Sequence, residues 1–236
     1  MCFKTIASLW IFLLSAWWVQ PSEAPARPPA AVSPGSGGVN VKFQWACTGL
    51  VGNSKPRDGI VITNDTTLKR GDEIELMVVV QTNCFVYVLR QDTRKQVHLL
   101  FPYHLKQFEE DYRLNTKYYI PQGPGYLQLD QNAGLESIFL LASAQRLVPL
   151  EKLLQSHLSA DETRKPELAN SIIKEIGNLR VRSRLSRTLA ERPVRIGGGT
   201  RGDGEVKAGE RYHYLAVGTE ITERDFYDKA ISIEIR

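Results

Sequence analysis

The sequence predicts a mainly β domain with a helical insertion (class α+β), in which a β-sandwich-like core carries helices between its central and final strands. Three observations predict this class. Apolar and polar residues alternate with a period of two from residue 39 onward, helical spacing replaces this pattern near residue 149, and the strand pattern returns at the carboxyl end. A content of 42% hydrophobic and 24% charged residues excludes collagen, wholesale disorder and a polytopic membrane protein. The net charge of +4 is too small to indicate nucleic-acid binding, and no nucleic-acid partner is expected.

The amino-terminal residues have the pattern of a secretory signal peptide. Lys4 precedes a 14-residue uncharged run at 6–19, which is shorter than the roughly 20 residues that a helix needs to span a bilayer. Small residues follow, and we expect cleavage after Ala26, so that 1–26 is the signal peptide; the alternative is an uncleaved membrane anchor. The location predicted is therefore outside the cytosol, in the periplasm or at the cell surface, with no transmembrane helix after cleavage.

The remaining chain divides into a tether and one domain. Residues 27–38 are rich in Pro, Ala and Gly and are expected to form an extended or flexible tether, because they cannot bury a core. The domain is expected to span 39–236. Within it remain Cys47 and Cys84, and two cysteines in an exported chain favour one disulfide. The alternative is a pair of buried free thiols, which behave as small apolar residues.

The strands are expected in the first half of the domain. Val39, Val41, Phe43, Trp45 and Cys47 alternate with other residues, as in a half-buried strand. By the same reasoning the further strands are expected at 60–63, 74–81, 84–90, 96–101, 117–120, 126–129 and 135–143. Pro102 ends one of them because it lacks an amide donor, and 103–115 is expected to be a polar, irregular loop.

The helical insertion is expected over about 149–190. Pro149 and Pro166 each stand at a helix start, and apolar residues follow at helical spacing. The second helix is expected to run to about Leu189. A Gly-rich loop at 196–205 and closing strands at 211–217 and 230–235 complete the domain.

The central stretch resembles a known family. The segments that carry the resemblance are GDEI at 71–74, VYVL at 86–89, LLFP at 99–102, YIP at 119–121, GLESI at 134–138 and AS at 142–143, leading to PL at 149–150. Over about 67–153 the chain is similar to the family of domain of unknown function 4384. The resemblance implies a small β-rich module on exported or surface proteins, often appended to other domains, with no established catalytic residues.

One candidate binding surface lies in the irregular loop. Glu109, Glu110 and Asp111 form an acidic cluster beside three tyrosines, Tyr103, Tyr112 and Tyr119. Aromatic residues beside polar loops are suited to contacts with sugars or proteins. The alternative is a solvated acidic loop with structural aromatic residues.

A second candidate surface is an arginine-rich helix face. Arg180, Arg184 and Arg187 share one face if the helix continues that far, because residues three and four apart are neighbours. Such a face could bind an anionic surface, and the alternative is a solvated helix face.

No motif specifies catalysis, a metal or a cofactor. The four histidines lack metal-ligand spacing, and the GxGxxG match at 197–202 is followed by a strand pattern instead of the helix that nucleotide binding needs. The functional hypothesis is a non-catalytic module of the cell envelope that binds a protein or glycan. Two alternatives stay open: an exported hydrolase using the carboxylates at 109–111 or Cys84, and an accessory subunit that docks on a membrane complex through the arginine-bearing helix.

Overall fold

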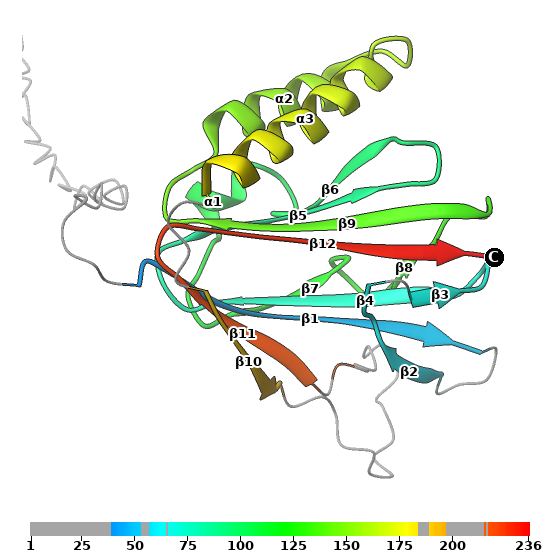
Figure 1. The fold of residues 1–236 in the computed structure, drawn as a ribbon, viewed down its shortest axis with the longest axis horizontal. Coiled ribbons are helices and arrows are strands. Elements are labelled where there is room, and N and C mark those ends of the chain that lie inside the picture. Colours follow the sequence, from blue (N-terminus) through cyan, green and yellow to red (C-terminus); the bar gives the residue numbers. More distant parts are fainter. Residues whose placement is uncertain (1–38, 53–56, 65, 184–188, 197–214, 216) are drawn as a thin grey trace, which may run out of the picture. The chain divides into compact units, whose positions relative to one another are not determined.

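The computed structural model describes residues 39–52, 57–64, 66–183, 189–196, 215 and 217–236, all of which belong to the unit Gly35–Arg236 (Figure 1). The predicted signal peptide and tether lie outside these residues. The strands are β1 (Val41–Val51), β2 (Asp58–Val61), β3 (Thr66–Leu68), β4 (Glu73–Val80), β5 (Phe85–Gln91), β6 (Val97–Phe101), β7 (Lys117–Ile120), β8 (Leu127–Gln128), β9 (Gly134–Ser143), β10 (Ala190–Arg195), β11 (Val217–Glu223) and β12 (Phe226–Ile235). The helices are α1 (Gln107–Glu110), α2 (Val148–Ser159) and α3 (Lys165–Ser183).

The strands form two sheets that face each other, which confirms the mainly β, α+β class. The first has the order β10-β11-β1-β4-β7, with β2 paired to β1 and β8 paired to β4. The second has the order β3-β12-β9-β5-β6. Helices α2 and α3 lie side by side against the outer face of the second sheet (Figure 1), so the predicted helical insertion forms a third layer.

Alternation along the strands separates two apolar layers. On β5, Val86 and Val88 point into the core between the sheets, whereas Tyr87 and Leu89 point to the helices. Phe101 at the end of β6 is completely buried in the inter-sheet core. Each such large apolar side chain contributes roughly 1.5–3 kcal/mol on burial, so the two layers together hold the sheets and helices in place.

Helix α2 presents two different stripes. Pro149 stands in its first turn, where the missing amide proton is not needed, as expected from the sequence. Leu150, Leu154 and His157 lie three and four residues apart and are buried against the second sheet. The neighbouring stripe, which contains Val148, Lys152 and Leu158, is exposed.

The closing strands differ from the sequence prediction. A strand was expected at 211–217, but most of that segment lies outside the described residues, and β11 begins at Val217 and runs to Glu223. Strand β10 occupies 190–195, at the end of the predicted helical insertion. Its residues are almost all exposed and do not alternate, so pairing with β11, and not the local pattern, makes it a strand.

The predicted disulfide is wrong, because Cys47 and Cys84 are both free and buried. The Cys84 thiol lies 3.9 Å from the carbonyl oxygen of Lys42, five residues before Cys47 on the same strand. At about 3.3 Å per residue the two cysteines are about 16 Å apart along β1, and a disulfide needs Cα atoms within about 7 Å. The alternative of two buried thiols is the one that the structure has.

Candidate functional site

An open groove runs between α2 and the chain that leaves β6. Its larger part is a cavity of about 570 Å³. One wall is the exposed stripe of α2, and the other is formed by Leu99 at the end of β6 and the loop into α1. The lining residues are Leu99, Tyr103, His104, Leu105, Lys106, Glu109, Arg146, Val148, Glu151, Lys152, Gln155 and Leu158. Two of the six predicted surface residues, Tyr103 and Glu109, therefore lie in this groove.

A partly buried ion pair forms the end of the groove nearest α1. Arg146 donates to both carboxylate oxygens of Glu151, at 2.7 Å from Nη2 to Oε2 and 3.0 Å from Nε to Oε1. Its other terminal nitrogen donates to Glu109 at 2.5 Å, and its guanidinium carbon lies 5.4 Å from the centre of the Phe108 ring. The hydrogen bonds to Glu151 raise the pKa of Arg146, so the guanidinium stays charged.

Tyr87 connects this ion pair to the helix–sheet layer. Its hydroxyl donates to Glu151 at 2.6 Å and accepts from the Leu147 amide at 3.1 Å. Burial is the main cause that raises the pKa of Tyr87 well above its ordinary value. Since every polar group of Tyr87 and Glu151 that faces the interior has a partner, this network fixes where α2 starts relative to the sheet.

Two of the three predicted tyrosines, Tyr103 and Tyr112, have hydroxyl groups that bind the protein's own backbone, whereas Tyr119 lies in β7 and packs against a separate apolar cluster that includes Met77. The Tyr103 hydroxyl donates to the carbonyl of Tyr119, and the Tyr112 hydroxyl donates to the carbonyl of Cys84 and accepts from the Val86 amide. The ring of Tyr112 stacks with Tyr118 and packs edge-on against Phe108. Burial raises the pKa of Tyr112. Their structural contacts make Tyr112 an anchor of the loop, whereas Tyr103 also has a side facing the groove.

The three predicted carboxylates do not form one site, because they have different partners. Glu109 pairs with Arg146 at the groove, while Asp111 pairs with the exposed Arg113 at 3.0 Å. All three carboxylates, including that of Glu110, are exposed. Only Glu109 therefore lines the groove.

A second cavity continues the groove toward the β5–β6 turn. It has a volume of about 440 Å³ and shares Leu99 and Leu158 with the first. Its lining residues are Asp92, Arg94, Gln96, Val97, His98, Leu99, His157, Leu158, Glu162 and Lys165. The two cavities together form one groove beside β6. They meet at Leu99 on β6 and Leu158 at the end of α2.

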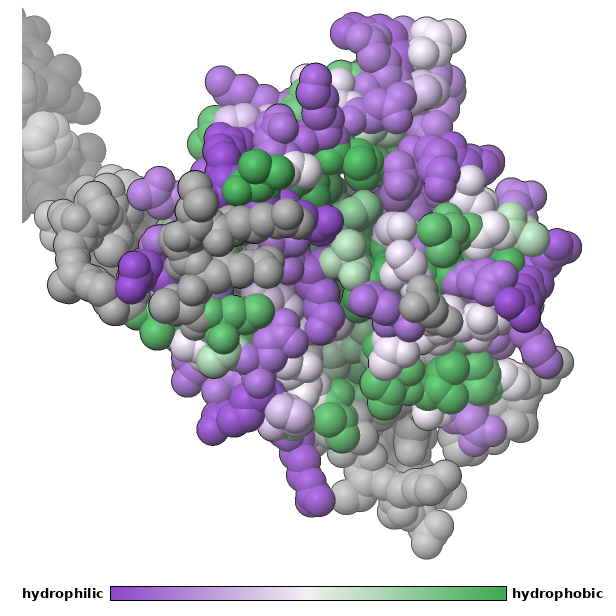
Figure 2. Space-filling view, viewed as in Figure 1, coloured by the Kyte–Doolittle hydropathy of each residue, from purple (hydrophilic) through white to green (hydrophobic). Residues whose placement is uncertain are grey.

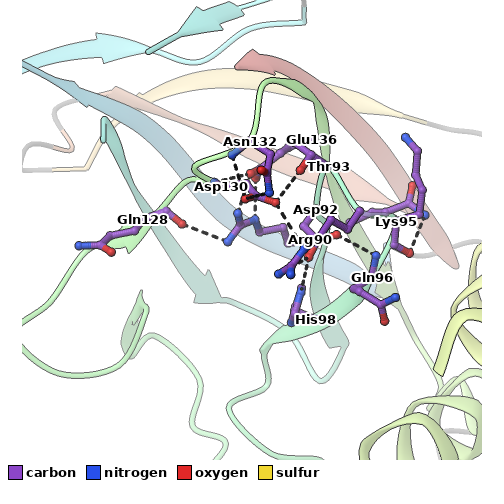
Figure 3. Close-up of polar contacts among 12 residues, drawn as sticks. Arg90, Asp92, Thr93, Lys95, Gln96, His98, Gln128, Asp130, Asn132 and Glu136 are labelled. Carbon is purple, nitrogen blue, oxygen red and sulfur yellow. Dashed lines mark hydrogen bonds and ion pairs between the residues drawn. The ribbon is translucent and has the colours of Figure 1, made fainter. Parts of the chain in front are cut away.

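A polar network holds the turn beside this second cavity (Figure 3). Arg90 donates to both oxygens of Glu136 at 2.6 Å, and the Asp130 amide donates to the same carboxylate at 2.7 Å. The Thr93 hydroxyl donates to Asp130, and this hydrogen bond is the main cause that lowers the pKa of Asp130. The turn is thus attached to the segment that precedes β9.

Asp92 extends this network to the groove. It accepts from the Gln96 amide at 2.8 Å and lies 3.2 Å from Nε2 of His98 (Figure 3). Its carboxylate is buried, and His98 is about half exposed. His98 is thereby oriented at one wall of the second cavity.

The predicted arginine face is only partly inside the described chain. Arg180 donates to Asp228 on β12 at 2.6 Å, which attaches α3 to the second sheet. Arg184 and Arg187 lie outside the described residues. The one described member of this set is therefore engaged within the molecule.

The thiols have raised pKa values. Burial raises the pKa of Cys47 to about 12 and also raises the pKa of Cys84. A thiol nucleophile needs the thiolate, which burial disfavours. In the part of the chain that the structure describes, no three His, Cys, Asp or Glu side chains are grouped so that they could hold a metal ion, and no helix is long and apolar enough to cross a membrane.

Comparison with known families identifies one match. Residues 67–146 match the family model described as domain of unknown function (DUF4384). The DUF4384 segment resembles the family over about a third of the chain and runs from β3 to the end of β9, including Arg146. No curated protein and no solved structure matches the chain. The resemblance predicted from the sequence is confirmed for the segment, whose end falls before α2.

Sequence reasoning missed the residues that α2 and the segment just before it contribute to the groove. Arg146, Glu151 and Leu158 were not predicted, although one signal was available. Glu151 and His157 are polar residues next to or within the apolar stripe of a helix, and a buried polar residue in such a stripe needs a partner or a role. The partner of Glu151, Tyr87, is 64 residues away in the sequence, so no local pattern connects them.

Proposed function

We propose that this protein is a non-catalytic binding module of the cell envelope, and that it holds a segment of a partner protein in the groove between α2 and β6. The observation that carries the proposal is the groove itself, which is open to solvent and is framed at one end by the buried hydrogen-bond network of Tyr87 and Glu151. A rigid frame beside an open groove is suited to binding, because little ordering is needed when a partner arrives.

The side chains of the groove favour a protein segment. Leu105, Val148 and Leu158 supply apolar surface, and Val148 and Leu158 are 48% and 64% exposed. Lys106 and Lys152 have no carboxylate partner within the described residues. A segment that carries both apolar and acidic side chains would complement these groups.

A smaller cavity of about 280 Å³, with Val61 and Val217 in its lining, lies elsewhere on the domain beside β2 and β11. Figure 2 shows one face of the molecule, on which several apolar patches lie among hydrophilic side chains. Proteins without a partner rarely expose contiguous apolar patches larger than a few hundred Å², so a groove with apolar walls is the favoured place for contact.

Site-directed photo-crosslinking tests the proposal. Benzoylphenylalanine replaces Leu158 in the groove of the full-length protein, and in a matched control it replaces Val181, which is 66% exposed on α3 and does not line the groove. We expect a crosslink from position 158 to one contiguous segment of one protein, and none to that segment from position 181. A crosslink of equal yield from both positions, or to many unrelated proteins, would contradict the proposal.

A peptide with the crosslinked sequence then provides the quantitative test. Leu158→Asp and Lys152→Glu should each weaken its binding about tenfold or more, since the first introduces a charge at the apolar wall and the second reverses a charge at the rim. Val181→Asp should leave its affinity unchanged. Binding of a neutral glycan in place of the peptide would overturn the choice of a protein partner.

We propose the location on separate grounds, namely the residue pattern of 1–26. A carboxyl-terminally tagged full-length product should be found outside the cytosol, and its mass should correspond to a chain that begins at Arg27. Recovery of the unprocessed chain from the soluble cytosolic fraction would contradict this location without affecting the groove.

A further inference from the structure

His157 occupies a position in α2 where an apolar residue is expected. It follows Leu150 and Leu154 on the buried stripe of the helix and is 6% exposed. Its Nε2 atom is buried and has no hydrogen-bond partner. An apolar environment tolerates a neutral imidazole at modest cost, but a charged imidazolium would lose its hydration without receiving an acceptor.

The acids near His157 are already engaged. The charged and titratable groups that line the same cavity are His98 from β6, Asp92 and Arg94 from the β5–β6 turn, Glu162 from the α2–α3 connection and Lys165 from α3. Asp92 binds His98 and the Gln96 amide, and Glu162 pairs with Lys165. A proton on His157 would therefore face three other basic groups, Arg94, His98 and Lys165, and find no free carboxylate among the residues that line this cavity.

Two effects oppose this conclusion. The negative charge of Glu162 favours a proton on His157, and His157 stands in the last turn of α2, where the helix dipole favours a positive charge. The loss of hydration around a buried charge is the larger effect. The net effect is a lowered pKa of His157. Burial is the main cause of the decrease from 6.5, followed by the charges of Lys165 and His98.

The position of His157 connects its charge to the groove. The next residue, Leu158, lines both cavities, and His157 lines the second. Movement of the last turn of α2 away from β6 would let water reach Nε2 and would at the same time displace Leu158 from the groove.

We propose that protonation of His157 releases the last turn of α2 from β6, so that the groove loses its partner at acidic pH. This regulation rests on the proposed function for its consequence, but the release itself does not require a partner. The sign follows from linkage. Because folding lowers the pKa of His157, stability at this turn is complete above 6.5 and decreases as the pH falls from there through the lowered value.

Hydrogen exchange of the full-length protein without a partner tests the release. Exchange is measured at about pH 7.5 and about pH 5, on either side of the ordinary histidine pKa, and corrected for the intrinsic effect of pH on exchange. We expect the amides of 155–160 to lose protection at the lower pH, by about tenfold for each unit by which folding lowers the pKa. The central amides of α3, from Ala169 to Ile176, should change less.

Two variants identify the group that titrates. His157→Leu removes the ionisable ring and keeps an apolar residue in the stripe, so it should abolish the loss of protection. His98→Gln is the matched control, because His98 lines the same cavity but is 49% exposed and bound to Asp92; the loss should persist in it. Equal protection of wild type at both pH values, or the same loss in His157→Leu, would overturn the proposal.

A measurement on the unmodified chain covers the case in which His157→Leu does not fold. The four histidines are followed by NMR during a pH titration, and the ring of His157 should titrate below 6.5. The midpoint of the loss of protection should coincide with that titration, and a His157 that titrates at or above 6.5 would overturn the proposal. Capture of the partner at neutral pH tests the proposed function separately, so each idea can fail without the other.

Discussion

The inter-sheet core and the helix–sheet layer are built differently. Between the sheets, apolar residues such as Phe43, Val78 and Ile138 fill the space, and the free thiols of Cys47 and Cys84 behave as further apolar groups. Between the second sheet and the helices, Tyr87, Glu151 and His157 are buried among the apolar residues. Apolar contacts dominate the first layer, whereas the second contains a buried carboxylate and a buried imidazole, and the groove opens on that second layer.

The largest expected effect comes from a cavity in the inter-sheet core. Phe101→Ala should lower the free energy of unfolding by about 3–5 kcal/mol, because the ring is fully buried and packs against Tyr103, Tyr112 and Tyr118. Urea denaturation measures the loss. Leu135→Ala, at a 48% exposed position on β9, is the control and should change stability by less than about 1 kcal/mol. A loss below about 1 kcal/mol in Phe101→Ala would show that this layer tolerates voids.

The buried polar contact in the helix–sheet layer should give the next largest effect. Tyr87→Phe removes the hydroxyl that binds Glu151 and the Leu147 amide, and should cost about 1–3 kcal/mol. A double-mutant cycle with Glu151→Gln should show coupling of at least about 0.5 kcal/mol, since the two groups are in contact. Additive losses in urea denaturation would contradict the assignment of Tyr87 and Glu151 to one network.

Two arginines on α3 test how much an ion pair to the second sheet contributes compared with an exposed ion pair within the helix. Arg180→Ala should cost about 1–2 kcal/mol, because it leaves the carboxylate of Asp228, which is 5% exposed, without its guanidinium partner. Arg182→Ala is the matched control, since Arg182 is 64% exposed and pairs with Glu175 on its own helix; it should cost no more than about 0.5 kcal/mol. Equal losses in the two variants would mean that Asp228 does not depend on Arg180.

The smallest expected effect concerns the turn beside the second cavity. Thr93→Val removes the hydroxyl that binds Asp130 and should cost about 0.5–1.5 kcal/mol near neutral pH. The pKa of Asp130 is lowered from 3.8 by this bond, so its contribution is present above that value and is lost as the pH falls through the lowered value. Wild type and variant should therefore converge in stability at strongly acidic pH, and a difference that does not depend on pH would exclude this cause.

Most strands and both long helices could be predicted because their signals are local. Val41, Phe43 and Trp45 alternate along β1, and Pro149 and Pro166 mark the starts of helical spacing in the right places. Strand β10 could not be predicted in this way. Its residues are almost all exposed, and among the described strands it pairs with β11 alone, more than 20 residues later in the chain.

The candidate site was predicted in part, for a related reason. Tyr103 and Glu109 lie in the predicted loop and in the groove, because the composition of that loop is itself unusual. Tyr112 was placed on the surface by the same reasoning, and its ring proved to be packed and its hydroxyl bonded to backbone. Composition indicates which side chains gather in a loop, but it does not indicate which way each one points.

The sequence by itself determined the class of the fold, the succession of the central strands along the chain and the position of the helical insertion. It also determined the resemblance of the DUF4384 segment. All of these depend on residues close together in the chain. The tertiary structure alone decided that Cys47 and Cys84 are far apart, that Glu151 meets Tyr87 and Arg146, and that α2 lies along β6 to form a groove. Apart from the contact of Arg146 with Glu151, those contacts join residues tens of positions apart. They depend on how the twisted sheets and helices pack against one another, which no local pattern of residues specifies.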